Sequence, residues 1–119
     1  AIGRYAFYKC SSLTSITLPA GVTSIGRYAF AYCSSLTSIT IPEGVTSIED
    51  YTFYECSSLK EVFCKPTTPP NGGWRMFSSN ASGRKIYVPA SDDDSIINAY
   101  KTADYWSDYA DAFEEYEFE

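Results

Sequence analysis

The sequence predicts a solenoid of stacked repeats, built mainly from short β-strands and tight helical turns, with a C-terminal α/β cap. Residues 2–24 and 25–47 agree at 19 of 23 positions, and a third copy starts at Ile48 and diverges after Leu59. Self-similarity at a fixed period is typical of stacked coils, in which each repeat contacts only its neighbours. After Pro89 the repeat pattern gives way to a helical one.

Each repeat is expected to contain two short strands and a turn. Residues 13–19 alternate apolar Ile16 and Leu18 with polar side chains and end at a proline, which predicts a strand. A second extended piece is expected over residues 22–25, and a tight helical turn over residues 5–10 returns the chain. The period of 23 residues lies within the range of leucine-rich repeats.

Apolar residues recur at matching positions of the copies, and we expect these columns to form the core. They are Ile2/Ile25/Ile48, Phe7/Phe30/Phe53, Leu13/Leu36/Leu59, Ile16/Ile39/Val62 and Leu18/Ile41/Cys64. The spacing from Phe77 to Ile86 and Val88 repeats that of the first copy, which predicts a degenerate fourth coil one residue late. Residues 65–73 are expected to replace its second strand. Residues 1–65 are therefore assigned to the repeats, and residues 66–119 to the fourth coil and cap of the same domain.

The cap is predicted from the last third of the chain. The run Asp92 to Asp94 precedes Ile96, Ile97 and Tyr100, whose spacing predicts a helix with the acids near its positive end. Tyr116 and Phe118 alternate with Glu115, Glu117 and Glu119 and could supply a final strand. A stack of coils needs such a segment to cover its last open face.

The charge distribution argues against nucleic acid as a partner. Residues 1–90 contain eight basic and five acidic residues, a net charge of +3, whereas residues 91–119 contain one basic and ten acidic residues, a net charge of −9. A nucleic-acid-binding protein needs a basic face, which these scattered cations do not supply. No apolar run approaches the roughly 20 residues of a membrane span.

The cysteines predict a buried ladder of reduced thiols. Cys10, Cys33 and Cys56 recur at one position of the repeat, and Cys64 falls in a core column. Each thiol is expected to donate a weak hydrogen bond to the backbone, and Asn80 occupies the same column in the fourth coil. Disulfides and a metal site are the weaker alternatives, since the chain has no histidine and no CxxC motif.

The composition also argues against an enzyme. The chain has no histidine, which is the commonest general base and the usual partner of a serine or cysteine nucleophile. It also has no glycine-rich phosphate loop. The carboxylates of Asp92 to Asp94 are more simply explained by helix capping than by catalysis, and their consecutive spacing is poor for calcium. No catalytic residue, cofactor or metal ligand is therefore expected.

The candidate partner-binding surface is the outward column Thr17, Thr40, Phe63 and Tyr87. Its polar residues give way to aromatic ones toward the cap, and exposed aromatic residues are favoured at interface hot spots. The alternative interpretation is that the cap packs over the two aromatic rings and buries them.

The motif IGRYAFYKCSSLTSITLP resembles the BspA-like leucine-rich repeats, over residues 1 to about 65. The later segments FCKPTTPP, MFSSNASGRKIYVP and AYKTADYWSDYA are similar to the region that follows such repeats in Bacteroides-type surface proteins. The run Asp92 to Asp94 departs from that pattern. The resemblance implies a secreted or surface-anchored bacterial protein that takes part in adhesion, with no catalytic residues.

We therefore expect a non-enzymatic adhesion or recognition module that binds a host or microbial protein or glycan. The alternative is a purely structural capping region of a longer solenoid, with binding carried elsewhere. Residue 1 falls inside a repeat, so we expect any signal or anchor to lie outside this chain. We also expect a homodimer through the N-terminal edge, where Ile2, Phe7 and Leu13 lack a neighbouring coil.

Overall fold

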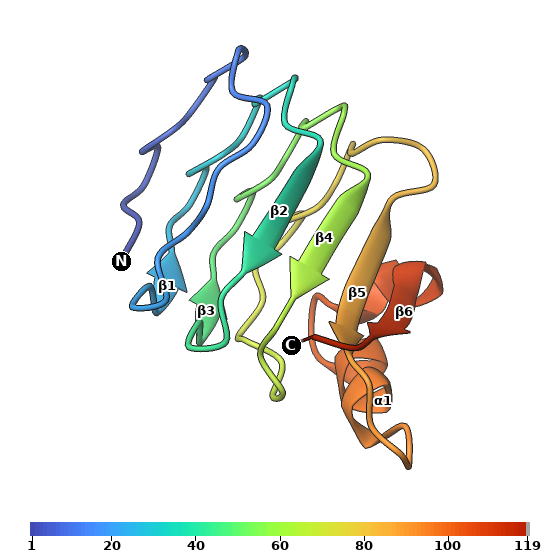
Figure 1. Cartoon of the computed structure of the whole chain (residues 1–119). Coiled ribbons are helices and arrows are strands. Elements are labelled where there is room, and N and C mark those ends of the chain that lie inside the picture. The colour runs from blue at the N-terminus through green and yellow to red at the C-terminus, as the bar shows by residue number, and fades with distance from the viewer. Residues whose placement is uncertain (119) are drawn as a thin grey trace.

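The repeats form successive coils of one continuous stack, with the cap at its far end (Figure 1). A computed structural model describes residues 1–118. The front of the stack is a parallel sheet in the order β2-β4-β5-β6. These strands are β2 (Ser38–Ile41), β4 (Glu61–Cys64), β5 (Lys85–Pro89) and β6 (Phe113–Tyr116). A two-stranded parallel sheet is made by β1 (Ser24–Ile25) and β3 (Ser47–Ile48).

The strand register reproduces the sequence period. Ser38 of β2 pairs with Glu61 of β4, a shift of 23 residues, and Glu61 pairs with Lys85 of β5, a shift of 24. The degenerate fourth coil is thereby confirmed, with its one extra residue. The side chains of Ile39 and Ile41 are buried while Thr40 between them is exposed, so the predicted alternation holds for this copy.

The strand predicted over residues 13–19 does not form in the first copy. These residues remain outside the regular ladder, and their contact with the second coil includes a hydrogen bond from Thr37 N to Thr14 O of 3.3 Å. The first coil has a neighbour on one side only within the described chain. The equivalent residues form β2 in the second coil, which pairs with β4 alone, and β4 in the third coil, which pairs with both β2 and β5.

The predicted helical turn over residues 5–10 is wrong. Four-residue turns form instead, such as the one closed by the hydrogen bond from Cys10 N to Phe7 O (3.1 Å), and Tyr5 and Lys9 have positive φ angles of 60° and 61°. The amides of alternate residues point to the next coil, where Phe7 N donates to Ala29 O at 2.7 Å. A helix would use these amides internally, so stacking and helix formation compete, and stacking prevails.

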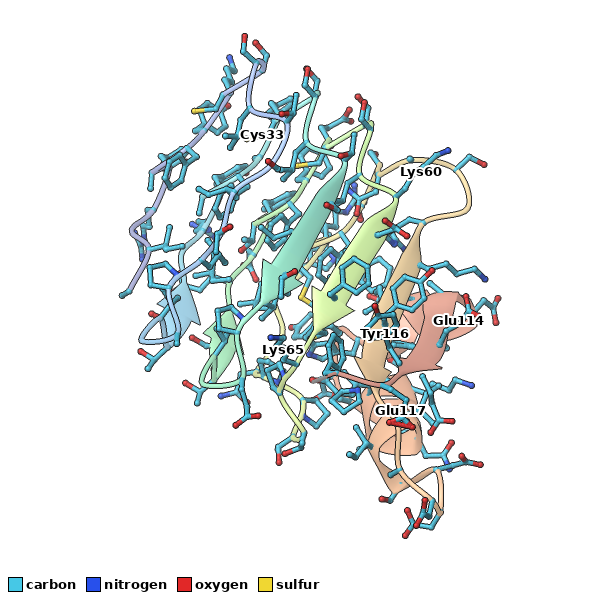
Figure 2. The ribbon with its side chains drawn as sticks, viewed as in Figure 1. Cys33, Lys60, Lys65, Glu114, Tyr116 and Glu117 are labelled. Carbon is cyan, nitrogen blue, oxygen red and sulfur yellow. The ribbon has the colours of Figure 1, made fainter. Side chains whose placement is uncertain are left out.

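Two columns of side chains run through the stack between the sheet and the turn segments. The rings of Phe7, Phe30, Phe53 and Phe77 are stacked at centroid distances of 5.1, 5.3 and 5.4 Å. Cys33 Sγ donates to Phe7 O (3.1 Å) and Cys56 Sγ to Phe30 O (3.0 Å), and Cys33 lies inside the coils in Figure 2.

Asn80 continues the cysteine column in the fourth coil. Its Nδ2 donates to Phe53 O at 2.9 Å, the carbonyl that corresponds to the acceptors of Cys33 and Cys56. The predicted hydrogen-bonding ladder is therefore confirmed. Cys10, which has no preceding coil in the described chain, is only half-buried.

The loop between β4 and the fourth coil keeps a remnant of the second strand. Asn71 forms an isolated bridge with Ser47, so the expectation that residues 65–73 replace this strand entirely is corrected. The loop re-enters the stack at Gly73, where a Cβ atom would overlap the backbone of Glu49 and Asp50. Only glycine permits this close approach.

The cap contains the helix α1 (Ser95–Thr102), the 3-10 helix η1 (Ser107–Ala112) and strand β6. Helix α1 confirms the sequence prediction, and β6 ends at Tyr116, so Phe118 lies beyond the strand. Tyr100 Oη donates to Pro66 O (2.6 Å) and Trp106 Nε1 to Pro70 O (2.7 Å). The cap therefore extends the sheet by one strand and ties down the irregular loop.

Candidate functional site

The predicted column lies on the open front of the four-stranded sheet. Strand register places Thr40 beside Phe63 and Phe63 beside Tyr87, because the three residues occupy equivalent positions of β2, β4 and β5. Thr17 lies in the first coil and lines the same face. The structure thus brings the four candidate residues onto one surface.

The aromatic part of this surface includes a residue that the sequence did not indicate. The rings of Phe63 and Tyr87 stack with centroids 5.0 Å apart and an interplanar angle of 15°. Tyr116, at the end of β6, packs edge-on against both, with centroid distances of 5.3 and 5.6 Å. We call Phe63, Tyr87 and Tyr116 the aromatic cluster. Tyr116 was expected only as part of a final strand, and pairing of β6 with β5 is what brings it here.

The aromatic cluster is only partly covered by the cap. Phe63 and Tyr87 are half-buried, and Tyr116 is 44% exposed. Partial burial, with Glu114 and Glu61 nearby, raises the pKa of Tyr87 above its usual value of 10.0. Tyr87 therefore presents a neutral hydroxyl group to solvent at physiological pH, beside the ring edges of the cluster.

A groove of about 520 Å³ lies below the aromatic cluster, at the carboxyl ends of the strands. Tyr116 and Glu117 approach one side of it and Lys65 lies at the end of β4 (Figure 2). It is lined by Thr17, Leu18, Ala20, Thr40, Pro42, Glu43, Lys65, Thr67, Pro89, Ala90, Tyr116, Glu117 and Phe118. Two of the predicted residues, Thr17 and Thr40, therefore line the groove, while Phe63 and Tyr87 belong to the aromatic cluster.

The groove combines hydroxyl groups, apolar surface and charge of both signs. Glu43 and Glu117 supply carboxylates, and Lys65 supplies an ammonium group. Above the aromatic cluster, Lys85 Nζ lies 3.6 Å from Glu114 Oε2, with both side chains about half exposed. Mixed polar and aromatic surfaces of this kind are suited to recognition of another molecule by hydrogen bonding and ring contacts.

The thiols of Cys56 and Cys64 are poorly suited to nucleophilic chemistry. Burial raises the pKa of Cys64 to about 12. The pKa of Cys56 is raised by the hydrogen bond of its thiol with Cys33 and by burial. A thiol must ionise to act as a nucleophile. Within residues 1–118, no group of three or more metal-ligating side chains is found.

A second aromatic surface was missed by the sequence analysis. It lies on the turn segments, on the side of each coil opposite the four-stranded sheet (Figure 1). Its stacked row contains Tyr5, Tyr28 and Tyr51, with centroids 5.1 and 4.9 Å apart. We call the whole surface the tyrosine face, and it comprises Tyr5, Tyr8, Tyr28, Tyr32, Tyr51, Tyr54 and Trp74. Recurrence of tyrosine at positions 5, 28 and 51 was the available signal.

The backbone of the tyrosine face is strained. Tyr5, Tyr28, Tyr51 and Tyr32 have φ angles between 59° and 62°, in the left-handed region that glycine and asparagine normally occupy. This conformation costs about 1–2 kcal/mol per non-glycine residue. Stacking of the rings offsets part of that cost, at roughly 0.5–1.5 kcal/mol per aromatic pair. The side chains are thus retained at positions that their backbone disfavours.

The comparison with protein families agrees with this geometry. A family described as "BspA type Leucine rich repeat region (6 copies)" matches residues 1–102. The chain belongs to the BspA-type leucine-rich repeat family, and its repeat fold is confirmed. No curated protein matches the sequence significantly. Among residues 1–118, no helix has the length and apolar character needed to cross a membrane.

Proposed function

We propose that this chain is a non-enzymatic recognition module of the bacterial surface, and that it binds a host or microbial macromolecule through the front of its sheet. The observation that supports this most directly is the open aromatic cluster beside a groove of about 520 Å³. Family membership supports an interaction role of this kind. The proposal assumes a leucine-rich-repeat solenoid, in which parallel coils place side chains from distant parts of the sequence on one face.

The binding chemistry follows from the side chains of this face. Ring edges and the hydroxyl groups of Tyr87 and Tyr116 would contact the ligand, while Thr40 and the carboxylates of Glu43 and Glu117 would fix its orientation. Tyrosine favours interfaces because it supplies a large contact area with few rotatable bonds. Both protein and glycan ligands are compatible with this set of groups.

The alternative function is purely structural. Tyr100, Trp106 and Phe113 of the cap are buried, and they close the end of the stack. A chain whose task is to terminate a longer array would need these residues and would leave binding to other coils.

The experiment is a binding screen of the purified chain against matrix proteins and oligosaccharides, by biolayer interferometry. Tyr116→Ala is the test variant, and Tyr105→Ala is its control because Tyr105 is equally exposed on the cap, at 45%. We expect Tyr116→Ala to weaken binding by about tenfold or more, as hot-spot aromatic residues do. Equal binding by both variants would contradict binding through the aromatic cluster, and no binding by the wild-type chain would favour the structural alternative.

A further inference from the structure

The first three coils of the tyrosine face are symmetric in shape about the second coil, and Trp74 of the fourth coil lies outside this symmetry. One column carries a tyrosine in each of the first three coils, at positions 5, 28 and 51. The neighbouring column carries Tyr8 and Tyr54 in the outer two coils and the small, fully buried Ala31 between them. Reversing the order of these three coils therefore leaves the pattern of large and small side chains unchanged.

The charges of the outer two coils are reversed by that operation. Lys9 in the first coil and Glu55 in the third occupy the same column, with the neutral Tyr32 between them. A second column contains Arg4, Arg27 and Asp50, and Arg27 pairs with Asp50 of its own chain at 3.5 Å. Exchange of the first and third coils would thus place Lys9 at the position of Glu55 and Arg4 at the position of Asp50, while Arg27 keeps its place.

We propose that the tyrosine face binds a second copy of this chain, in a dimer whose two-fold axis crosses the second coil and runs parallel to its turn segment. Rotation about this axis places the first coil of one copy opposite the third coil of the other. Lys9 then faces Glu55 of the second copy, and Arg4 faces its Asp50, and each pair occurs twice because the interface is isologous. Arg27 faces its own counterpart, and Asp50 of the same chain, 3.5 Å away, offsets part of that repulsion. The central Tyr32 meets its own counterpart.

The charges also exclude the other face-to-face arrangement. An axis that ran along the stack would keep the coil order and exchange the two charged columns. Arg4 would then face Lys9, and Asp50 would face Glu55, so that like charges meet at both ends. Juxtaposed like charges suppress association. The axis across the second coil instead gives opposite charges at both ends of the face, where Lys9 meets Glu55 and Arg4 meets Asp50.

Three further observations favour a second copy as the occupant. The aromatic rings are exposed, with Tyr5 at 51% and Tyr32 at 38%, although tyrosine strains the backbone at both positions. Strained residues are concentrated at functional sites. The acidic caps, each with a net charge of −9 over residues 91–119, would lie at opposite ends of this dimer and would not repel one another strongly.

The dimer is expected to be weak. The face spans three short turn segments, which falls below the roughly 800 Å² per partner of a standard interface. Cation–π contacts already hold Lys9 Nζ near the rings of Tyr8 and Tyr32, at 5.3 and 5.9 Å, so this ammonium group is positioned at the surface. The attraction between exposed charges should decrease as salt increases.

The test is sedimentation equilibrium of the full chain over a concentration series, with charge reversals. Lys9→Glu and Glu55→Lys should each raise the dimer dissociation constant by about tenfold, because each replaces two attractive contacts by repulsive ones. The double variant should restore the wild-type constant to within about threefold. Lys60→Glu, the same change on the opposite face, should have no effect.

A second variant separates dimerisation from stacking within the chain. Tyr32→Asn removes the central ring and suits the left-handed backbone, so it should abolish the dimer while the melting temperature stays the same or rises. A wild-type chain that is monomeric at every concentration overturns the proposal. A double variant that dimerises as weakly as the single variants also overturns the proposal. So does a dimer that survives these changes but is abolished by Ile16→Glu at the edge of the first coil.

Discussion

The cysteine column shows how a small side chain connects neighbouring coils. Cys33 and Cys56 each donate to a phenylalanine carbonyl 26 residues earlier in the chain, and Asn80 makes the equivalent contact with an amide group. These carbonyls are enclosed by the stack. Without the side-chain donor, each would be a buried acceptor with one hydrogen bond fewer.

Replacement of Cys56 by alanine should therefore destabilise the protein. We expect Cys56→Ala to lower the free energy of unfolding by about 1–3 kcal/mol, through the lost hydrogen bond and the space left behind. Cys10→Ala is the matched control, because Cys10 is half-buried. Its effect should be below about 1 kcal/mol. Urea unfolding measures both, and equal effects would show that the hydrogen bond contributes nothing.

Stability should decrease at alkaline pH. Cys64 keeps its proton in the folded chain up to a pKa of about 12, whereas an unfolded thiol ionises near 8.5. Above pH 8.5 the unfolded state thus binds fewer protons than the folded state. The contribution of the Cys64 thiol to the free energy of unfolding is therefore complete below that pH and is lost between about pH 9 and 12. The slope is about 1.4 kcal/mol per pH unit for one such group. Burial also raises the pKa of Tyr100.

Urea unfolding at pH 7, 9 and 10 measures this slope. Cys64→Ala should be less stable than the wild type at pH 7 but should lose stability less steeply as the pH rises. An unchanged slope in this variant would mean that the Cys64 thiol does not contribute to the alkaline transition.

The cap is the element on which the end of the sheet depends. Strand β6 pairs with β5 from Ile86 to Pro89. Deletion of residues 91–119 would expose this edge, together with the apolar surface under Tyr100 and Trp106. We expect the truncated chain to unfold or aggregate, which solubility and circular dichroism would show. A soluble fragment that melts cooperatively would mean that the cap is independent of the repeats.

The regular elements were predictable where the sequence pattern has one physical cause. The alternation in residues 38–41 and the apolar spacing after Asp94 follow directly from burial of one side of a strand or helix. The turn segments were not predictable in this way. Their amides satisfy one another between coils, and the sequence of a single repeat does not distinguish this from a helical turn.

The candidate site was also predictable in part, from the repeat period. Thr17, Thr40, Phe63 and Tyr87 share a column, so the period placed them on one face. The contribution of Tyr116 depends on the path of the cap, which the repeat pattern does not specify. The tyrosine face was overlooked because its residues fall in segments where a tight helical turn was expected.

At the scale of the whole molecule, the coils separate two surfaces. The front of the sheet carries the aromatic cluster and the groove, and the opposite side carries the tyrosine face. A dimer through the tyrosine face would leave both front surfaces free, so one assembly could contact two ligands and gain avidity. Association through the edge of the first coil, where Ile2 and Phe7 lie, stays a separate prediction.

Both surfaces exist only because the coils stack in a fixed register, and amide hydrogen exchange tests that register directly. The amides of Phe30, Tyr32 and Phe53 donate to carbonyls of the following coil, at 2.9, 2.8 and 2.8 Å. We predict that these amides are protected to the level of global unfolding, since they open only when coils separate. Exchange of these amides at the rate of an unstructured chain, while the amides of α1 remain protected, would contradict the stacked arrangement.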